Sequence, residues 1–393
     1  MKLLIYSHYF APSLGGVENI VRKLASGLAR LPFAGSSGEF EVVVVTQTGR
    51  GTFDDSTLPF RVVRKPGFLR LTELIHKSDL VHLAGPALLP LFLARLVHKP
   101  VVVEHHGYQT ICPSGSLLLQ PELDMCPGHY QAGHFGTCFR CVRAELPAVR
   151  SAQALILTGL RAWLCKRATN VTVSQHMTMR LSPSLRLQVI HHGVEGPGEQ
   201  NALEFEKIGR PSRICFAYVG RFVSEKGIPV LLNAARQVMD EGLRFDLLLI
   251  GDGPDREKLQ NEITGNGLDC CTRITGFLQG AALNEALERV HAVVMPSICE
   301  ETAGLSAIEQ MMRGRLVIAS SIGGLAEIVG DAGMLFKPRD VGALASCMKK
   351  VIREPELIFQ LGTKARQRAL EFFGYSRMLE EHAQVYRRLL AAG

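Results

Sequence analysis

Short apolar runs rich in Val, Ile and Leu alternate along the whole chain with segments of helical periodicity. The first half contains KLLIYSH, EVVVVTQ, FRVVRK, LVHLAG, PVVVEHH, NVTVSQ and LQVIHHGV, and the second half contains ICFAYVGR, FDLLLIGDG, RITGFL, AVVMPS, LVIASS and GMLFKP. Continuous apolar strands separated by helices are typical of parallel sheets that are buried on both faces. Two successive sets of strands in a chain of 393 residues predict two tandem Rossmann-like α/β domains.

The polar stretch EGPGEQNALEFEKIGRPS interrupts this alternation and predicts a linker. We expect an N-terminal domain over residues 1–195, a linker over 196–212 and a C-terminal domain over 213–373. Residues 374–393 have the periodicity of an amphipathic helix, for which the N-terminal domain is a candidate packing partner.

Composition and charge narrow the class of protein. Hydrophobic residues make up 47% of the chain and charged residues 21%, which is typical of a soluble globular protein and argues against disorder. Residues 1–200 hold 20 Lys and Arg against 13 Asp and Glu, whereas the remainder holds 24 of each, so the whole net charge of +7 lies in the first half. Attraction to an anionic membrane surface or a phosphate-bearing acceptor fits this asymmetry, and a random surface excess explains it equally well. We expect no nucleic-acid partner.

The sequence predicts a cytoplasmic protein. Its start, MKLLIYSHYFAPSLGG, lacks the pattern of an export signal and predicts a first strand, and no run of 18 apolar residues occurs. Residues 151–167, SAQALILTGLRAWLCKR, combine an apolar stripe, the single Trp and a basic end. They predict a half-buried helix, with a helix lying on the inner face of the cytoplasmic membrane as the alternative.

Ligands of open parallel sheets bind beyond the carboxyl ends of the strands. In YVGRFVSEKG a strand ends before Arg221 and Lys226, two cations near a glycine turn that suit a diphosphate. In LIGDGPDREKL the strand–glycine–helix form recurs at Gly251, but Arg256 occupies the third glycine position of a dinucleotide motif. The chain also lacks the phosphate loop of ATP-type phosphoryl transferases.

The stretch SICEETAGLSAIEQ places the carboxylates of Glu301 and Glu309 around the start of a helix. The backbone amides near Gly304 and Leu305 favour a phosphate at that helix terminus. Glu309 is then placed to accept the hydroxyls of a ribose, and Glu301 to reach a sugar ring. A general acid/base pair is the alternative interpretation.

These motifs together resemble a known family. GRFVSEKG, IGDGP, ITGFL, MPSICEETAGLSAIEQMMRGRLVIAS and GGLAEIVGDAGMLF are similar to the donor-binding domain of glycosyltransferase family 4, within the glycosyl transferases group 1. SHYFAPSLGGVENIVRKLASGLA and VVVEHHGYQTICPSG are similar to its acceptor domain, so the resemblance covers essentially the whole chain. It implies a GT-B fold, in which two parallel sheets face each other across a cleft. It also implies a metal-independent, retaining hexosyltransferase for cell-surface polysaccharide or glycolipid synthesis, with a UDP- or GDP-sugar donor and a carbohydrate or lipid-linked acceptor.

The resemblance also implies a role for each site residue. Arg221 and Lys226 neutralise the donor diphosphate, Glu309 holds the ribose, and Glu301 and His106 lie by the transferred sugar. Further donor contacts come from glycines and their neighbours, namely Gly16, Gly251, Gly276, Phe277, Leu278, Gly304 and Leu305. The chain departs from the family pattern at Gly107, His192, Ala303 and Gln310. These departures leave the identity of the sugar open.

Two other functions share this fold. A nucleotide-sugar epimerase acts on the donor without any acceptor, and a non-catalytic binding module keeps the fold without the chemistry. The joint presence of Arg221, Lys226, Glu301 and Glu309 argues against the binding module.

Four of the ten cysteines, Cys112, Cys126, Cys138 and Cys141, lie in a segment rich in Gly and Pro with little periodicity. A loop of this length within a compact domain requires a staple or a function. Four thiolates fit a structural zinc, with an iron–sulfur cluster, free thiols or redox chemistry as alternatives and His129 and His134 as substitute ligands. Catalysis itself is expected to need no cofactor.

Overall fold

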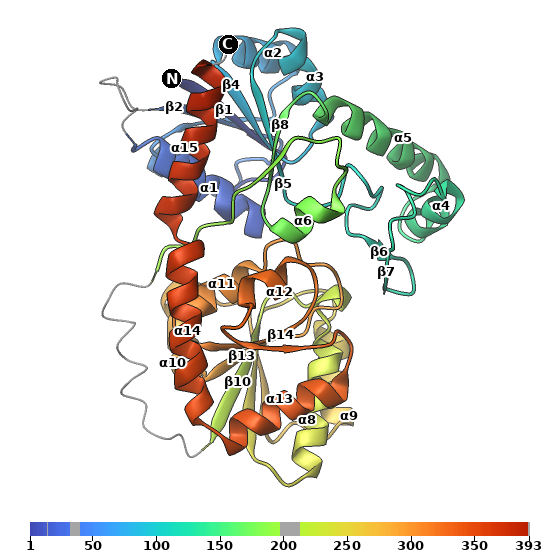
Figure 1. Ribbon diagram of the computed structural model, residues 1–393, viewed down its shortest axis with the longest axis vertical. Helices are drawn as coiled ribbons and strands as arrows, with labels where there is room; N and C mark the ends of the chain where they lie inside the picture. Colours follow the sequence, from blue (N-terminus) through green and yellow to red (C-terminus); the bar gives the residue numbers. More distant parts are fainter. Residues whose placement is uncertain (14, 32–39, 197–212, 392–393) are drawn as a thin grey trace. The chain divides into compact units, whose positions relative to one another are not determined.

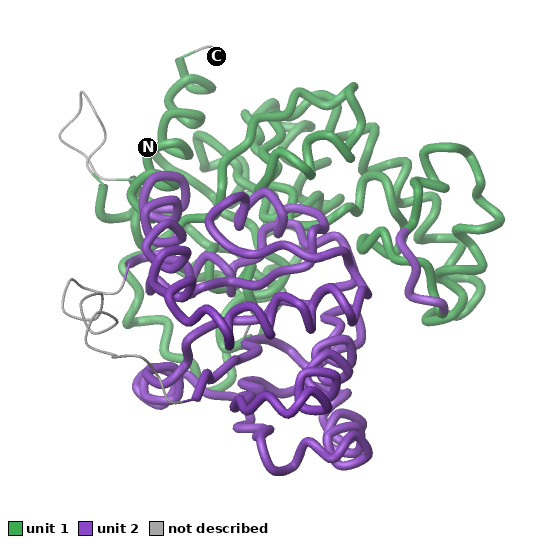
Figure 2. The backbone as a smooth tube through the Cα atoms, turned by 60° about the horizontal axis from the view of Figure 1, so that its bottom comes forward, with its two compact units in different colours: residues 1–121, 126–193, 375–393 green, residues 122–125, 194–374 purple. Residues whose placement is uncertain are grey.

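The computed structural model describes residues 1–13, 15–31, 40–196 and 213–391. They form two compact units, shown in different colours in Figure 2. Unit 1 comprises Met1–Pro121, Cys126–Gly193 and Tyr375–Gly393, and unit 2 comprises Glu122–Met125 and Val194–Gly374. The expected linker, 196–212, lies almost entirely outside the described residues. The chain passes between the units at Gly193–Val194 and Gly374–Tyr375, and the short segment Glu122–Met125 of unit 2 interrupts unit 1.

Unit 1 is built on a parallel sheet of seven strands in the order β3-β2-β1-β4-β5-β8-β9 (Figure 1). The strands are β1 (Lys2–Ser7), β2 (Glu41–Thr46), β3 (Arg61–Arg64), β4 (Leu80–Ala84), β5 (Val101–His105), β8 (Thr169–Thr172) and β9 (Leu187–Val189). The helices are α1 (Gly16–Leu28), the short 3₁₀ helix η1 (Asp55–Thr57), α2 (Phe68–Lys77), α3 (Leu88–Leu96), α4 (Phe135–Arg143), α5 (Ala148–Cys165), α6 (Gln175–Arg180) and α15 (Tyr375–Ala391).

Unit 2 has a parallel sheet of six strands in the order β12-β11-β10-β13-β14-β15. The strands are β10 (Ile214–Val219), β11 (Phe245–Ile250), β12 (Thr272–Gly276), β13 (Ala292–Met295), β14 (Leu316–Ser320) and β15 (Met334–Phe336). The helices are the 3₁₀ helix η3 (Ser224–Lys226), α8 (Ile228–Asp240), α9 (Arg256–Gly265), α10 (Gly280–Glu288), α11 (Leu305–Met312), α12 (Gly323–Val329), α13 (Val341–Arg353) and α14 (Glu356–Phe372). Two clusters of buried apolar side chains form its core.

Every strand that the apolar runs predict is present, and all are parallel within their sheets. The sequence did not predict the small sheet of β6 (Leu118–Leu119) and β7 (Asp124–Met125) in the cysteine-rich segment. Strands of two residues are too short to show an alternating pattern. The α/β prediction with two parallel sheets is therefore confirmed.

The expected terminal helix is α15, which belongs to unit 1 although unit 2 precedes it in the chain. The Tyr375 hydroxyl donates to the Lys23 carbonyl of α1 at 2.8 Å, and Leu379 is buried. The Tyr386 hydroxyl lies 2.9 Å from His82 Nδ1 on β4. Across the part of the chain that the structure describes, no helix has the length and apolar character that crossing a membrane requires.

Candidate functional site

The strand order of unit 2 reverses direction at β10 and β13, which are neighbours in the sheet. Such a switch point is where doubly wound sheets bind ligands, beyond the carboxyl ends of the strands. Hydrogen bonds join the strand ends on one side of it, from Gly220 N to the Ile250 carbonyl at 3.0 Å and from Gly251 N to the Gly276 carbonyl at 3.0 Å. Arg221 and Lys226 follow β10, and Glu301 follows β13. The sheet order thus places three of the predicted site residues at the switch point.

Lys226 and Glu301 form an ion pair there. Lys226 Nζ donates to Glu301 Oε1 at 2.5 Å, and the Ser297 hydroxyl donates to the same oxygen at 2.5 Å. Gly227 makes this pairing possible, because its φ is +65° and a Cβ there would lie 2.1 Å from the Pro296 carbonyl oxygen. The loops after β10 and β13 therefore approach closely, which brings the lysine and the carboxylate together.

Electrostatics keeps both partners ionised. Burial lowers and the Glu301 carboxylate raises the pKa of Lys226, which ends above its ordinary value. Burial raises and Lys226 lowers the pKa of Glu301, which ends below its ordinary value. The side chains are 20% and 12% exposed, so they are screened less than a surface pair. The structure thus pairs Lys226 with Glu301, which the sequence analysis treated separately. Arg221 lies beside them and is exposed.

Helix α11 begins at Leu305, directly after this pair. Its N-cap residue, Gly304, has φ +52° and ψ +44°, a left-handed conformation that suits glycine. The Gly324 amide donates to the Glu301 carbonyl at 2.7 Å and fixes the backbone of the acidic residue. Glu309 lies in the second turn of α11 and is partly buried. The helix terminus and both glutamates therefore belong to one unit and follow one strand.

The end of β12 supplies an apolar surface in the same unit. Phe277 is 54% exposed, whereas the neighbouring Leu278 packs against the core. An exposed aromatic ring at a strand end provides a stacking platform for a planar ligand group. Gly251 is confined by the chain, because a Cβ there would lie 1.9 Å from the Gly220 carbonyl oxygen.

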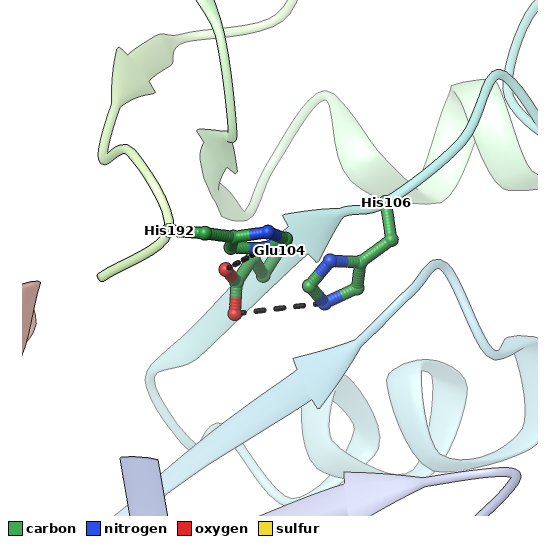
Figure 3. A group of neighbouring side chains, drawn as sticks. All are labelled: Glu104, His106 and His192. Carbon is green, nitrogen blue, oxygen red and sulfur yellow. Dashed lines mark ion pairs between the residues drawn. The ribbon is translucent and has the colours of Figure 1, made fainter. Parts of the chain in front are cut away.

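Unit 1 contains a buried carboxylate among histidines (Figure 3). Glu104, in β5, is fully buried, and its Oε2 lies 3.7 Å from His106 Nε2 while its Oε1 lies 3.6 Å from His192 Nε2. His82 Nε2 lies 3.2 Å from Oε2, and His382 Nε2 of α15 lies 3.7 Å from it. Glu104 thus connects β4, β5, the segment after β9 and α15.

The charge state of this cluster follows from burial. Desolvation lowers the pKa of His106 to about 3, which leaves this imidazole neutral at physiological pH. Desolvation opposes a charge on His382, but its contacts with Glu104 outweigh that cost and raise its pKa. Desolvation raises the pKa of Glu104, but the contacts with the surrounding histidines outweigh this effect and leave the pKa well below its ordinary value. The carboxylate is therefore ionised, and among its histidine neighbours it is His382 whose pKa rises.

Among the described residues, one group of three His, Cys, Asp or Glu side chains has ligand atoms that all lie within 4.8 Å of one another. It consists of Glu104, His106 and His192. Their spacing suits a metal ion, but the same carboxylate also contacts His82 and His382. We assign no metal there. The predicted residues His106 and Gly16 belong to unit 1, where Gly16 begins α1 after β1.

Sequence reasoning identified His106 but missed Glu104, His82 and His382. The available sign was a carboxylate inside the apolar run PVVVEHH, because a buried charge in a strand requires a partner. Its partners come from other strands and from the last helix, and no local pattern identifies them.

Comparison with known proteins finds glycosyltransferases, in agreement with the sequence motifs. Residues 213–354 match the family model described as glycosyl transferases group 1. The 2-deoxystreptamine glucosyltransferase of Streptomyces kanamyceticus is 28% identical over 249 residues, which cover 59% of this chain and 64% of that enzyme. The O-antigen chain mannosyltransferase C of Escherichia coli is 24% identical over 407 residues, or 99% of each chain. The first curated relatives are matched over less than two thirds of their own length, 64% for the Streptomyces enzyme.

Solved structures establish the fold. The sucrose-phosphate synthase of Thermosynechococcus elongatus superposes with a TM-score of 0.74 at 21% identity, covering 100% of both chains. HepE of Anabaena, solved in complex with UDP-glucose, has a TM-score of 0.71 at 16% identity, covering 99% of this chain and 100% of that one. The fold is accordingly GT-B, as the sequence motifs predicted.

Proposed function

We propose that this chain, whose residues 213–354 belong to the glycosyl transferases group 1 family, transfers a sugar from a UDP- or GDP-sugar to a carbohydrate or lipid-linked acceptor. The reaction retains the anomeric configuration and uses no metal ion. The observation that carries the proposal is the group formed by Lys226, Glu301 and Ser297 at the switch point of unit 2, with Arg221 beside it.

In the proposed reaction an acceptor hydroxyl attacks the anomeric carbon as the bond from that carbon to the diphosphate breaks. The hydroxyl proton passes to an oxygen of the departing diphosphate. Arg221, Lys226 and the amides at the start of α11 stabilise the negative charge that develops on this leaving group. They thereby supply the electrostatic stabilisation that a divalent cation provides elsewhere.

The remaining roles complete the donor site. Glu309 accepts the ribose hydroxyls, Phe277 and the backbone of Gly276 and Leu278 contact the base, and Gly251 and Gly304 let the backbone approach the ligand. Glu301 orients Lys226 and contacts the transferred sugar. The family resemblance assigns the neutral His106 to the sugar and Gly16 to the phosphates. These two residues belong to the same proposal.

The names of the relatives support a nucleotide-sugar donor and a carbohydrate acceptor. The Streptomyces relative is named a glucosyltransferase and the Escherichia coli relative a mannosyltransferase of an O-antigen chain, and HepE holds UDP-glucose. A role in cell-surface polysaccharide or glycolipid synthesis is consistent with the Escherichia coli relative, which matches this chain almost end to end.

We also propose that unit 1 binds the surface of an anionic membrane, the inner face of the cytoplasmic membrane. Helix α5 exposes Val149, Ile156, Leu160 and Trp163 at helical spacing, whereas Ser151 and Thr158 are buried. Residues 135–167 carry six Lys and Arg and one Glu. An apolar face flanked by basic residues favours anionic lipid. This face supports a lipid-linked acceptor or one that grows at the membrane.

The function is tested first by a thermal-shift screen of UDP- and GDP-sugars in the presence of EDTA, because a bound donor stabilises the folded protein by mass action. The stabilising donor is then assayed with candidate acceptors. Lys226→Ala should lower kcat by about 10²-fold, as the removal of one preorganised charge-stabilising group does elsewhere. The control is Lys258→Ala, which removes an exposed lysine of the same unit and should leave kcat unchanged.

Three outcomes contradict the proposal. Epimerisation or hydrolysis of the donor without an acceptor indicates the isomerase, and donor binding without any turnover indicates a binding module. Loss of turnover on adding EDTA, with recovery on adding a divalent cation, would show that a metal stabilises the leaving group.

A further inference from the structure

Four buried cysteines of unit 1 surround one small cavity. Cys112, Cys126, Cys138 and Cys141 line this cavity together with Leu118 and Val142, and all four are free thiols. Its volume is about 10 Å³, comparable to the space of one water molecule. Among the described residues that line it, none carries a formal charge at neutral pH. A small space walled by four sulfur atoms suits a single thiophilic metal ion.

Three separate pieces of backbone deliver these thiols. Cys138 and Cys141 lie one turn apart on α4. Cys112 occupies a tight turn in which its amide donates to the Tyr108 carbonyl at 2.8 Å and its carbonyl accepts from the Gly115 amide at 3.0 Å. Cys126 follows β7, and its amide donates to the Leu117 carbonyl at 2.8 Å. The two-residue spacing between Cys138 and Cys141 is one that structural zinc sites use, and four cysteines are one of their ligand sets.

The surroundings of the sulfur atoms support a bound cation. The Gln120 amide donates to Cys141 Sγ at 3.3 Å, an outer contact of the kind that orients metal-bound thiolates. His129 and His134 contact each other at 3.2 Å and do not line the cavity, which removes them as ligands.

We propose that Cys112, Cys126, Cys138 and Cys141 bind one structural zinc ion. The ion ties the segment between β5 and α4, whose only strands are β6 and β7, to the helix that follows it. No three of the four sulfur atoms, among the described residues, lie within 4.8 Å of one another, so the side chains close inward when zinc binds. The cavity volume favours a single ion over an iron–sulfur cluster.

Metal analysis of the full chain, purified without added metal, tests this proposal independently of any transferase activity. We expect one zinc and no iron per chain. Cys138→Ser should reduce the zinc content at least tenfold. The control is Cys165→Ser, which replaces a buried cysteine of the same unit outside the cavity and should keep one zinc.

A second measurement covers the case in which Cys138→Ser fails to fold. The wild-type chain is treated with a thiol-modifying mercurial, and the released zinc is counted with a colorimetric chelator. Cobalt(II) is then added to the reduced, zinc-depleted chain, where the proposal requires sulfur-to-cobalt charge transfer and tetrahedral d–d absorption. A wild-type chain that binds neither zinc nor cobalt overturns the proposal, as does a brown, iron-containing protein or a Cys138→Ser chain that keeps its zinc.

Discussion

Among single residues, Lys226 already forms an ion pair with Glu301 without a ligand. The Ser297 hydroxyl donates to the same Glu301 oxygen and holds it in place. An arriving diphosphate therefore meets a cation whose charge is already partly compensated. Arg221, exposed at the same strand end, lacks that constraint. In the proposed enzyme Arg221 then contributes mainly to capture of the donor, while Lys226 acts once leaving-group charge develops.

Replacing Glu301 by Gln should separate donor affinity from catalysis. Without the carboxylate, the full charge of Lys226 is available to UDP, and we expect about three- to tenfold tighter UDP binding by calorimetry, about 0.6–1.4 kcal/mol. The kcat should fall at least about tenfold because the lysine and the sugar lose their positioning group. Glu262→Gln, which removes the carboxylate 4.0 Å from Lys258 in the same unit, is the control and should change neither quantity. Weaker UDP binding by Glu301→Gln would instead show that the carboxylate contributes directly to nucleotide binding.

The buried histidines predict a loss of stability in acid. The pKa of His106 is about 3 in the folded chain and about 6.5 in an unfolded one, so between these values the unfolded chain binds more protons. Its contribution to the free energy of unfolding then falls by about 1.4 kcal/mol for each pH unit below 6.5. Burial shifts the pKa of His82 and His105 in the same direction. The raised pKa of His382 acts oppositely, since its stabilisation is complete below pH 6.5 and is lost above that value.

Urea unfolding of His106→Gln at pH 6, 5 and 4 checks the size of this effect. The slope of the free energy of unfolding against pH should become flatter than that of the wild type by about 1 kcal/mol per unit. The exposed His76 provides the control variant, His76→Gln, for which we expect the wild-type slope. A His106→Gln slope equal to that of the wild type would place the acid sensitivity in other groups.

Among the secondary-structure elements, most strands could be predicted from the sequence because they contain a run of β-branched or other apolar residues, whereas β12 (TRITG) has only one apolar side chain. The side-chain pairs that form between strands could not be predicted from the sequence. Glu104 and His82 lie in adjacent strands, β5 and β4, and Lys226 and Glu301 follow adjacent strands, β10 and β13, but only the strand order makes these residues neighbours. The motifs therefore identified site residues one at a time, while the pairings depend on long-range sheet topology.

Two glycines in helices provide a matched test of packing between elements. A Cβ at Gly27 of α1 would lie 2.4 Å from Leu379 Cδ1 and 2.5 Å from the Tyr375 hydroxyl of α15, whereas nothing lies within 4 Å of one at Gly265 of α9. Gly27→Ala should lower the free energy of unfolding by about 1–3 kcal/mol through overpacking. Gly265→Ala should raise it by about 0.5–1 kcal/mol through helix propensity. Chemical denaturation measures both, and stabilisation by Gly27→Ala would show that α15 accommodates the extra methyl group.

At the scale of the whole molecule, charge and exposed apolar area coincide in unit 1. The net charge of the chain resides in its first 200 residues, and α5 exposes a Trp and three aliphatic side chains there. Unit 2 also exposes large apolar side chains, such as Leu370 at 52%, but residues 201–393 have no net charge. Apolar and basic features together distinguish a membrane-binding face from scattered surface hydrophobics.

The double variant Ile156→Glu, Trp163→Glu should therefore bind vesicles containing phosphatidylglycerol at least about tenfold more weakly, because two inserted side chains and their favourable charge environment are lost. Co-sedimentation at low salt measures the binding. Leu370→Glu is the matched control in unit 2. Unchanged binding of the double variant, or equal loss in the control, would contradict the assignment of this face.

Helix α15 also has a consequence for how the chain is made. Its residues complete the interior of unit 1, where His382 and Tyr386 are fully buried beside strands that were synthesised first. A ribosome delivers unit 2 before it delivers this helix. Most of unit 1 is therefore synthesised before α15, and part of its interior stays uncovered while unit 2 forms its own sheet and core. Chaperones that shield nascent chains would then be needed most by the segment that emerges first.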